Sequence, residues 1–132
     1  MNSILSLDVG ESRVGVAIAN RIARLANPLT TLNNDDGFWA ELDKIIQAES
    51  VDLIVVGLPR NLSGDETAQT TYVRKFAENL PKDMVVFQDE ALTSIKAEAE
   101  LNKRGKPYAK GDIDSLAATY ILEDYLTGQE YA

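Results

Sequence analysis

The most constraining feature of this 132-residue chain is DLIVVGLP at residues 52–59, an almost unbroken apolar run with several branched side chains. Strands covered on both faces have this pattern, and they usually run parallel to their neighbours at the centre of a sheet. The preceding residues have helical periodicity instead, with Phe38, Leu42, Ile45 and Ile46 on one stripe. A helix that leads into a buried strand is typical of α/β proteins.

The residues before that helix predict an antiparallel meander. Residues 4–7 and 14–18 have the pattern of two strands joined by the turn DVGES. In the second strand, large branched residues alternate with glycine and alanine, which gives it one large and one small face. Residues 24–32 predict a third strand, and Pro28 places it at a sheet edge because proline cannot donate a backbone hydrogen bond.

The second half of the chain supplies the remaining elements. SGDE at residues 63–66 matches a capping box and predicts the start of a second helix. Residues 84–90, MVVFQDE, predict a short buried strand, and helices are expected at residues 92–104 and 113–126. The inward-facing residues expected of the second and last helices are Tyr72, Val73, Phe76, Leu80, Ile113, Leu116, Ala117, Tyr120 and Ile121.

The resulting order, βββαβαβαα, predicts an α/β fold with a mixed five-stranded sheet. Right-handed crossovers between its parallel strands would place helices on both faces. The chain has no internal repeat and no linker-like break, so residues 1–132 are expected to form a single domain.

Two absences restrict the chemistry. The chain has no cysteine, which excludes a disulfide framework and thiolate catalysis, and it has no histidine, which excludes Ser-His-Asp triads and histidine-rich metal sites. Any catalysis by this chain must therefore use carboxylates, lysines, hydroxyls, backbone dipoles or a metal ion.

Charge and hydropathy indicate whether the chain is suited to bind nucleic acid or a membrane. The net charge of −8 is not typical of a nucleic-acid binder, but KRGKPYAK at residues 103–110 holds four basic residues and no acid. The first residues lack the basic and apolar regions of a signal peptide, and no segment approaches the roughly 20 apolar residues of a membrane span. A cytoplasmic location without a membrane partner is expected.

Carboxylates follow two strands that are expected to be parallel. Asp8 comes at the end of the first strand, and Asp89 and Glu90 come after the last, while Asp112 and Asp114 open the final helix. Functional groups in open α/β sheets gather beyond the carboxyl ends of parallel strands. Several carboxylates on one rim repel each other unless a cation neutralises them, and hard oxygen ligands suit Mg²⁺ or Mn²⁺. Two such ions, about 3.5–4 Å apart, are the usual apparatus for phosphodiester cleavage.

Each of these carboxylates also has a purely structural interpretation. Aspartate after a strand commonly starts a turn, and acidic residues at a helix start cap the helix or complement its dipole. The loop GLPRNLSG at residues 57–64 can likewise be a phosphate-binding loop before a helix N-terminus or an ordinary tight connection.

Four segments carry a resemblance to a known family. LDVGESRVGVAIAN, VVGLPRNLSGDETAQTTYVRKFAENL, DEALTS and IDSLAATYILEDYL together resemble the YqgF (RuvX) family of Holliday junction resolvase-like proteins and pre-16S rRNA nucleases. The resemblance runs over residues 4–126, in order and with the family's spacing. It implies an RNase H-like fold, in agreement with the element order above.

The resemblance also implies functional residues. It assigns metal-binding catalytic roles to Asp8, Glu90 and Asp114, with Mg²⁺ or Mn²⁺ as cofactor. It favours Asp114 over Asp112 because the family's aspartate directly precedes the SLAA segment, and Asp112 is left as a helper outside the metal shell. One departure is Ala91, where the family commonly has an arginine that can hold phosphate.

The implied substrate is structured nucleic acid, either RNA in pre-16S rRNA 5′-end maturation and ribosome biogenesis or branched DNA. Ribosomal precursor particles are an implied partner. Gly10 and the small face of the second strand are interpreted as room for the substrate backbone. The residues expected to contact substrate are Gly10, Arg13, Arg60, Asn61, Ser63, Lys103, Arg104, Lys106 and Lys110.

Three other functions remain open. A Holliday junction resolvase would use the same carboxylates. A non-catalytic ribosome-assembly or transcription-associated factor would suit the acidic charge and Ala91, but it would gain nothing from carboxylates that repel each other. An actin-like or sugar-kinase-type ATPase also begins with D-x-G and a hairpin, but it needs a second domain of the same kind.

Overall fold

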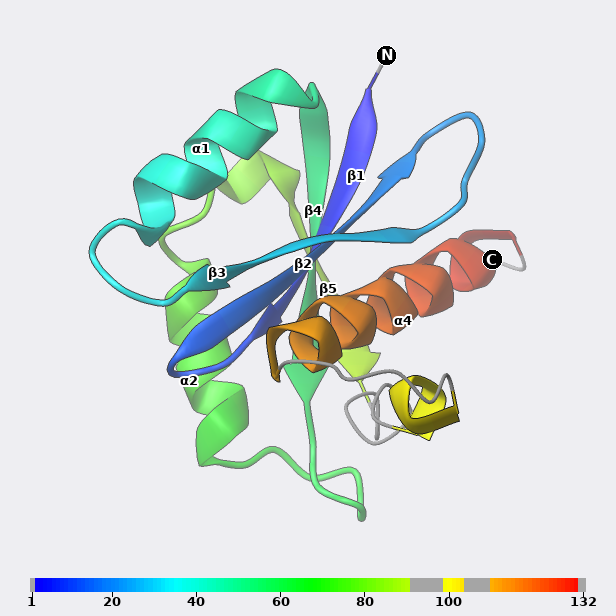
Figure 1. Ribbon diagram of the computed structural model, residues 1–132. Coiled ribbons are helices and arrows are strands. Elements are labelled where there is room, and N and C mark those ends of the chain that lie inside the picture. The colour runs from blue at the N-terminus through cyan, green and yellow to red at the C-terminus, as the bar shows by residue number, and fades with distance from the viewer. Residues whose placement is uncertain (1, 91–98, 104–109, 131–132) are drawn as a thin grey trace.

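The computed structural model describes residues 2–90, 99–103 and 110–130. These residues build a five-stranded sheet with helices on both faces (Figure 1). Residues 99–103 form a short helical segment. The other elements, in chain order, are β1 (Ser3–Val9), β2 (Arg13–Asn20), β3 (Asn27–Asn33), α1 (Phe38–Ala48), β4 (Val51–Pro59), α2 (Ala68–Ala77), the 3₁₀ helix η1 (Lys82–Met84), β5 (Val85–Glu90) and α4 (Lys110–Glu130).

The strand order is β3-β2-β1-β4-β5, and the sheet is mixed as predicted. β1 and β2 pair antiparallel, as do β2 and β3, whereas β1, β4 and β5 run parallel. Leu7 of β1 lies beside Val56 of β4, and Pro59 of β4 lies beside Glu90 of β5. The carboxyl ends of these three strands therefore meet at one edge of the sheet, which is the geometry that gathers functional groups in α/β proteins.

Alternate residues of the central strands pack into two separate hydrophobic cores, one on each face of the sheet. Leu7 and Val56 belong to the core under α1 and α2, which also contains Phe38, Leu42 and other buried apolar residues. Ile4 and Val55 belong to the core under α4. The apolar run at residues 52–59 is continuous because β4 is covered on both faces.

The small face of β2 packs against α4. Ala17 and Ala19 are buried in the same core as Ala118 and Ile121 of α4. A Cβ atom added to Gly15 would lie 1.9 Å from the backbone oxygen of Asp114. The interpretation of this face as room for substrate is therefore wrong, since the small side chains let a helix approach the sheet closely.

The second helix begins later than predicted. α2 starts at Ala68 after Thr67, whose N–H donates to the Thr70 hydroxyl at 2.9 Å. The Thr70 hydroxyl in turn donates to the backbone oxygen of Pro59 and thereby ties the helix to the end of β4. The capping box expected at residues 63–66 is wrong, because these residues belong to a turn organised by the side chain of Asn61.

The two outer strands differ from their predictions in detail. β3 is an edge strand as expected, but it begins at Asn27, because the preceding Arg24 has a left-handed φ of 56° within the turn after β2. β5 was predicted to be buried, yet it is half-buried and pairs with β4 as an outer strand of the described sheet. Its Phe87 and Asp89 are exposed.

α4 is the long helix that crosses one face of the sheet (Figure 1). It extends beyond the predicted residues 113–126 at both ends, and Leu116, Ala117 and Ile121 are buried as expected. Of the helix predicted at residues 92–104, residues 99–103 are helical, and the remainder lies outside the described residues. No helix in the described part of the chain combines the length and apolar character needed to span a membrane.

Candidate active site

A cavity of about 240 Å³ opens where the carboxyl ends of β1, β4 and β5 meet the start of α4. All three carboxylates predicted to be catalytic line it. The lining residues are Asp8, Val9, Gly10, Pro59, Gln69, Glu90 and Asp114.

Asp8 belongs to β1 itself and does not start the turn. It pairs with Gly15 of β2, and the turn is closed two residues later by the Gly10 N–H, which donates to the Arg13 oxygen at 2.9 Å. Leu7 and Val9 point into the core under α1 and α2, so Asp8 points to the opposite face, where α4 lies. Ser6, on that same face, donates to the Ala118 backbone oxygen at 2.6 Å. The strand pleat therefore aims Asp8 into the cavity.

Glu90 is the last residue of β5 and reaches the same cavity. Its approach depends on Gly57 in the adjacent strand β4. A Cβ atom at Gly57 would lie 2.6 Å from Glu90 Oε2 and 2.5 Å from Ile121 Cδ1. The absence of a side chain at position 57 therefore makes room for both the carboxylate and α4.

Asp114 comes from α4, whose start is fixed to the sheet at three points. Gly15 allows the Asp114 backbone to approach β2, as described above. The Thr31 hydroxyl of β3 donates to the Gly111 oxygen at 2.5 Å. Arg13 of β2 donates its Nε–H to Asp114 Oδ2 at 2.6 Å. Asp112, by contrast, is exposed and does not line the cavity.

Negative charge accumulates in this cavity. Burial, together with the smaller effect of the nearby charges of Glu90 and Asp114, raises the pKa of Asp8 from its ordinary value of 3.8 to about 8. An ionised Asp8 therefore needs a nearby positive charge to be stable at neutral pH.

The donor set fits Mg²⁺ or Mn²⁺ in kind, because carboxylate and carbonyl oxygens are the ligands that these hard cations prefer. Asp8, Glu90 and Asp114 are the side chains that would hold such an ion. As placed in the described part of the chain, however, no group of three or more His, Cys, Asp or Glu side chains converges closely enough to hold a metal ion. The Asp114 carboxylate is instead bonded to Arg13.

The residues predicted to contact substrate divide into two groups. Gly10 lines the cavity, and Arg13 is bonded to Asp114, which also lines it. Arg60, Asn61 and Ser63 do not line it.

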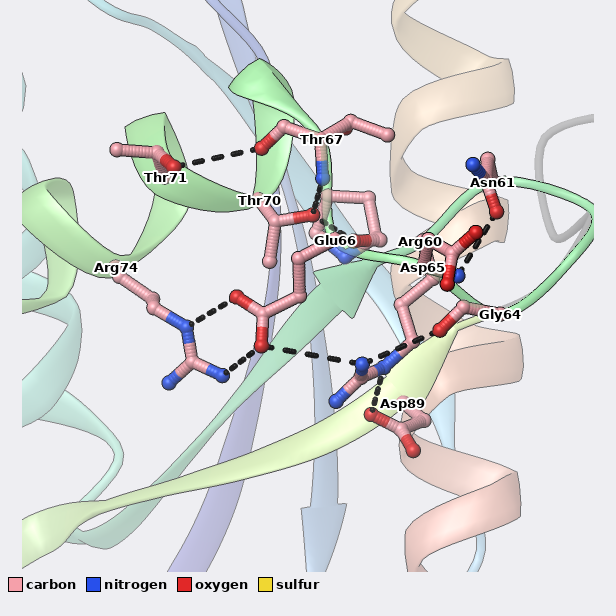
Figure 2. A network of polar contacts seen from close by, with 11 residues as sticks. Arg60, Asn61, Gly64, Asp65, Glu66, Thr67, Thr70, Thr71, Arg74 and Asp89 are labelled. Atoms are coloured by element: carbon pink, nitrogen blue, oxygen red, sulfur yellow. Dashed lines mark hydrogen bonds and ion pairs between the residues drawn. The ribbon is translucent and has the colours of Figure 1, made fainter.

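Figure 2 shows the polar contacts that Arg60 and Asn61 make in the loop after β4. Arg60 donates to Asp89 at 3.1 Å and lies 3.9 Å from Glu66, which also pairs with Arg74 at 3.0 Å. Asn61 Oδ1 accepts the backbone N–H groups of Ser63 and Asp65 at 3.0 and 2.8 Å. Arg60 and Asn61 thus hold the shape of this loop.

The predicted basic loop is described only in part. Lys103 is exposed at the end of the helical segment 99–103, outside the cavity lining. Lys110 is the first residue of α4, and its side chain lies outside what the structure describes. Arg104, Lys106 and Ala91 also lie outside the described residues.

Three site residues were not identified from the sequence. Gly57 and Gly15 make room for Glu90 and Asp114, and Gln69 of α2 lines the cavity and donates to the Val9 oxygen at 3.3 Å. A glycine within the apolar run of a central strand is a signal that could have drawn attention to Gly57, because such glycines often mark a close approach. No comparable signal distinguishes Gln69.

Comparison with known proteins identifies relatives of nearly full length. A family model described as RuvX, Holliday junction resolvase, matches residues 2–128. A protein of Sulfurihydrogenibium sp. (strain YO3AOP1) named "Putative pre-16S rRNA nuclease" is 39% identical over 131 residues, which cover 96% of this chain and 90% of that protein. A protein with the same name from Chloroflexus aurantiacus is 42% identical over 130 residues, which cover 93% of this chain and 85% of that protein.

A solved structure shows the same fold at low sequence identity. T. thermophilus RuvC, in complex with a Holliday junction substrate, has a TM-score of 0.56 and is 13% identical, with 98% of this chain and 96% of that chain covered. The likeness confirms the expected RNase H-like fold.

Proposed function

This chain belongs to the RuvX family, and from that premise we propose that it is a divalent-metal-dependent nuclease that hydrolyses phosphodiester bonds in structured nucleic acid. One observation carries the proposal. Asp8, Glu90 and Asp114, which are spread over more than a hundred positions of the sequence, line one cavity at the carboxyl end of a parallel sheet. Carboxylates in such a place are the usual apparatus of metal-assisted phosphodiester cleavage.

The names of the relatives support a particular substrate. Proteins at 39% and 42% identity over most of this chain are named as nucleases of pre-16S rRNA. We propose that the substrate is the 5′ region of pre-16S rRNA, as free RNA or within ribosomal precursor particles, and that the protein acts in ribosome biogenesis in the cytoplasm.

The three carboxylates have separate tasks in this proposal. Asp8 lies on β1, the middle strand of the sheet, and holds the position around which the others gather. Glu90 and Asp114 approach it from β5 and α4, so their relative position depends on how the helix docks. Mg²⁺ or Mn²⁺ bound here, in a two-metal arrangement, would activate water as the nucleophile and stabilise the departing oxygen. The positive charge of the ion would also keep Asp8 ionised at neutral pH.

A Holliday junction resolvase is the second candidate. It is favoured by the description of the matching family model, and the same carboxylates would serve the same chemistry on branched DNA. The two candidates differ in substrate and share the site, so one assay separates them.

That assay incubates the protein with Mn²⁺ or Mg²⁺ and either an RNA spanning the 5′ end of 16S rRNA or a four-way DNA junction. We expect metal-dependent cleavage of the RNA, and we expect Asp8→Asn to abolish it while leaving the fold intact by circular dichroism. Cleavage of the junction alone would favour the resolvase. Equal behaviour of wild type and Asp8→Asn on every substrate would leave the non-catalytic assembly factor as the better interpretation.

A further inference from the structure

The ion pair between Arg13 and Asp114 places a positive charge directly on one of the site carboxylates. The two atoms Arg13 Nε and Asp114 Oδ2 are 2.6 Å apart, and the side chains are only 38% and 21% exposed. Partial burial strengthens such a contact because less water screens it. The pair joins β2 to α4 across 101 positions of the sequence.

The backbone around Arg13 is held by a bonded turn. The Gly10 N–H donates to the Arg13 oxygen, and a Cβ at Gly10 would lie 2.8 Å from that same atom. Asn34 Nδ2 donates to the Gly10 oxygen at 2.7 Å and also contacts the Tyr72 hydroxyl at 2.9 Å. The turn therefore fixes the backbone of Arg13 beside the site, and only the flexible side chain of Arg13 can change its partner.

A divalent cation and Arg13 compete for the same carboxylate. Both carry positive charge, so a cation that binds Asp114 repels the guanidinium, and the guanidinium weakens the binding of the cation. When Arg13 leaves Asp114, its planar fork is matched to a phosphate group, which it can bind through two hydrogen bonds.

We propose that Arg13 exchanges between two anionic partners, which are Asp114 in the absence of a bound divalent cation and a phosphate of the nucleic acid in its presence. The exchange builds on the metal-dependent nuclease function proposed above, and it adds a coupling between metal binding and substrate binding. Metal bound at Asp114 releases Arg13 for phosphate, and by linkage the phosphate strengthens metal binding to the same degree.

Two other described arginines make their ion pairs with carboxylates outside the cavity lining. Arg60 is bonded to Asp89 and Gly64 and lies near Glu66, away from the cavity. Arg21 is paired with Asp52 at 2.8 Å, near the opposite end of β2 from Arg13. Arg21 has nearly the same exposure as Arg13, at 43%, and therefore provides a matched control.

The first test measures Mn²⁺ affinity by isothermal titration calorimetry in the absence of nucleic acid. Arg13→Gln removes the competing charge, so we expect it to bind Mn²⁺ at least about tenfold more tightly than wild type. Arg13→Lys keeps the charge and should stay close to wild type, and Arg21→Gln should be unchanged. Equal or weaker Mn²⁺ binding by folded Arg13→Gln overturns the exchange.

The second test measures the coupling itself. Fluorescence anisotropy of a hairpin RNA at 4 °C, read before cleavage accumulates, gives the affinity for RNA with and without Mn²⁺. We expect Mn²⁺ to tighten RNA binding by wild type and by Arg21→Gln at least about fivefold, and by Arg13→Gln less than about twofold. An equal effect of Mn²⁺ on all three proteins overturns the exchange.

The outcomes also separate this inference from the proposed function. If wild type binds Mn²⁺ and cleaves RNA but Arg13→Gln has the same Mn²⁺ affinity and coupling, the exchange is wrong and the nuclease stands. If neither wild type nor any variant binds Mn²⁺, the metal centre is wrong, and the exchange is wrong with it.

Discussion

Asp89 and Glu90 are neighbours at the end of β5, yet they belong to two different electrostatic environments. Asp89 points to the side of the β4–α2 loop, where Arg60 and Arg74 balance the charges of Asp89 and Glu66 (Figure 2). Glu90 lines the cavity with Asp8 and Asp114, and Arg13 pairs with Asp114 there. In the first cluster, called the loop network below, two arginines balance two carboxylates, whereas three carboxylates line the cavity.

This difference is the reason why a function is proposed for the cavity and a structural role for the loop network. In the loop network the pairing with Arg74 lowers the pKa of Glu66, so the carboxylate is stabilised in its charged form. In the site the pKa of Asp8 is raised to about 8, so the fold holds a carboxylate that it does not itself stabilise. Carboxyl groups whose pKa is perturbed in this way concentrate at functional sites.

The largest expected effect compares substitutions of the two neighbours. Glu90→Gln should lower the rate of RNA cleavage with Mn²⁺ by at least about 100-fold, because it removes a ligand charge. Asp89→Asn changes the adjacent residue in the same way but on the opposite face, and it should keep the rate within about threefold of wild type. Gel-based cleavage rates measure both, and similar losses for the two variants would contradict the division into two environments.

The next effect tests the room that Gly57 leaves for Glu90. Gly57→Ala places a methyl group against Glu90 and Ile121, so we expect a loss of about 1–3 kcal/mol in the free energy of unfolding and a clear fall in cleavage rate. Gly128→Ala is the control, because a Cβ there meets nothing within 4 Å and alanine favours the helix. Urea denaturation measures the stabilities, and a Gly57→Ala variant as stable and active as wild type would contradict the close packing.

A third effect concerns pH. The pKa of Asp8 is about 8 in the folded chain and near 3.8 in the unfolded chain, so the unfolded chain releases this proton first as the pH rises. In buffer with EDTA, the Asp8 contribution to stability should therefore be present below about pH 4 and be lost progressively up to about pH 8. Asp8→Asn lacks this loss, and its melting temperature at pH 8 should exceed that of wild type by roughly 4 °C or more. The advantage should be smaller at pH 5, and an advantage that is independent of pH would contradict the assignment to Asp8.

The smallest effect is expected in the loop network. Arg74→Ala removes an exposed pairing with Glu66 and the contact of the guanidinium with the Phe87 ring. Solvent screens exposed pairs, so the melting temperature should change by at most a few degrees and the cleavage rate should be nearly unchanged. A large loss of cleavage would show that this network supports the site.

The sequence predicted the edge of the sheet where the site lies, because two rules of local pattern were sufficient. The continuous apolar run of β4 indicated a parallel central strand, and the carboxyl ends of parallel strands meet at one edge. The pleat places Asp89 and Glu90 on opposite faces of β5, but periodicity alone does not say which face carries α4.

What the sequence did not reveal depends on how α4 docks. The contacts of Gly15 and Arg13 with Asp114 join residues distant in sequence and exist only after the helix lies on the sheet, while Gly57 meets Glu90 only once β4 pairs with β5. The start of α2 was misplaced for a different reason. Ser63 and Thr67 both have side-chain oxygens that can cap a helix, and local pattern does not show which of them does so.

The central claim is that Asp8, Glu90 and Asp114 hold a divalent cation, and thermal unfolding with and without Mn²⁺ tests it most directly. A ligand that binds only the folded state raises the melting temperature. Saturating Mn²⁺ should raise the melting temperature of wild type and of Asp89→Asn by several degrees and leave that of Asp8→Asn unchanged. An equal rise in Asp8→Asn, or no rise in wild type, would contradict the claim.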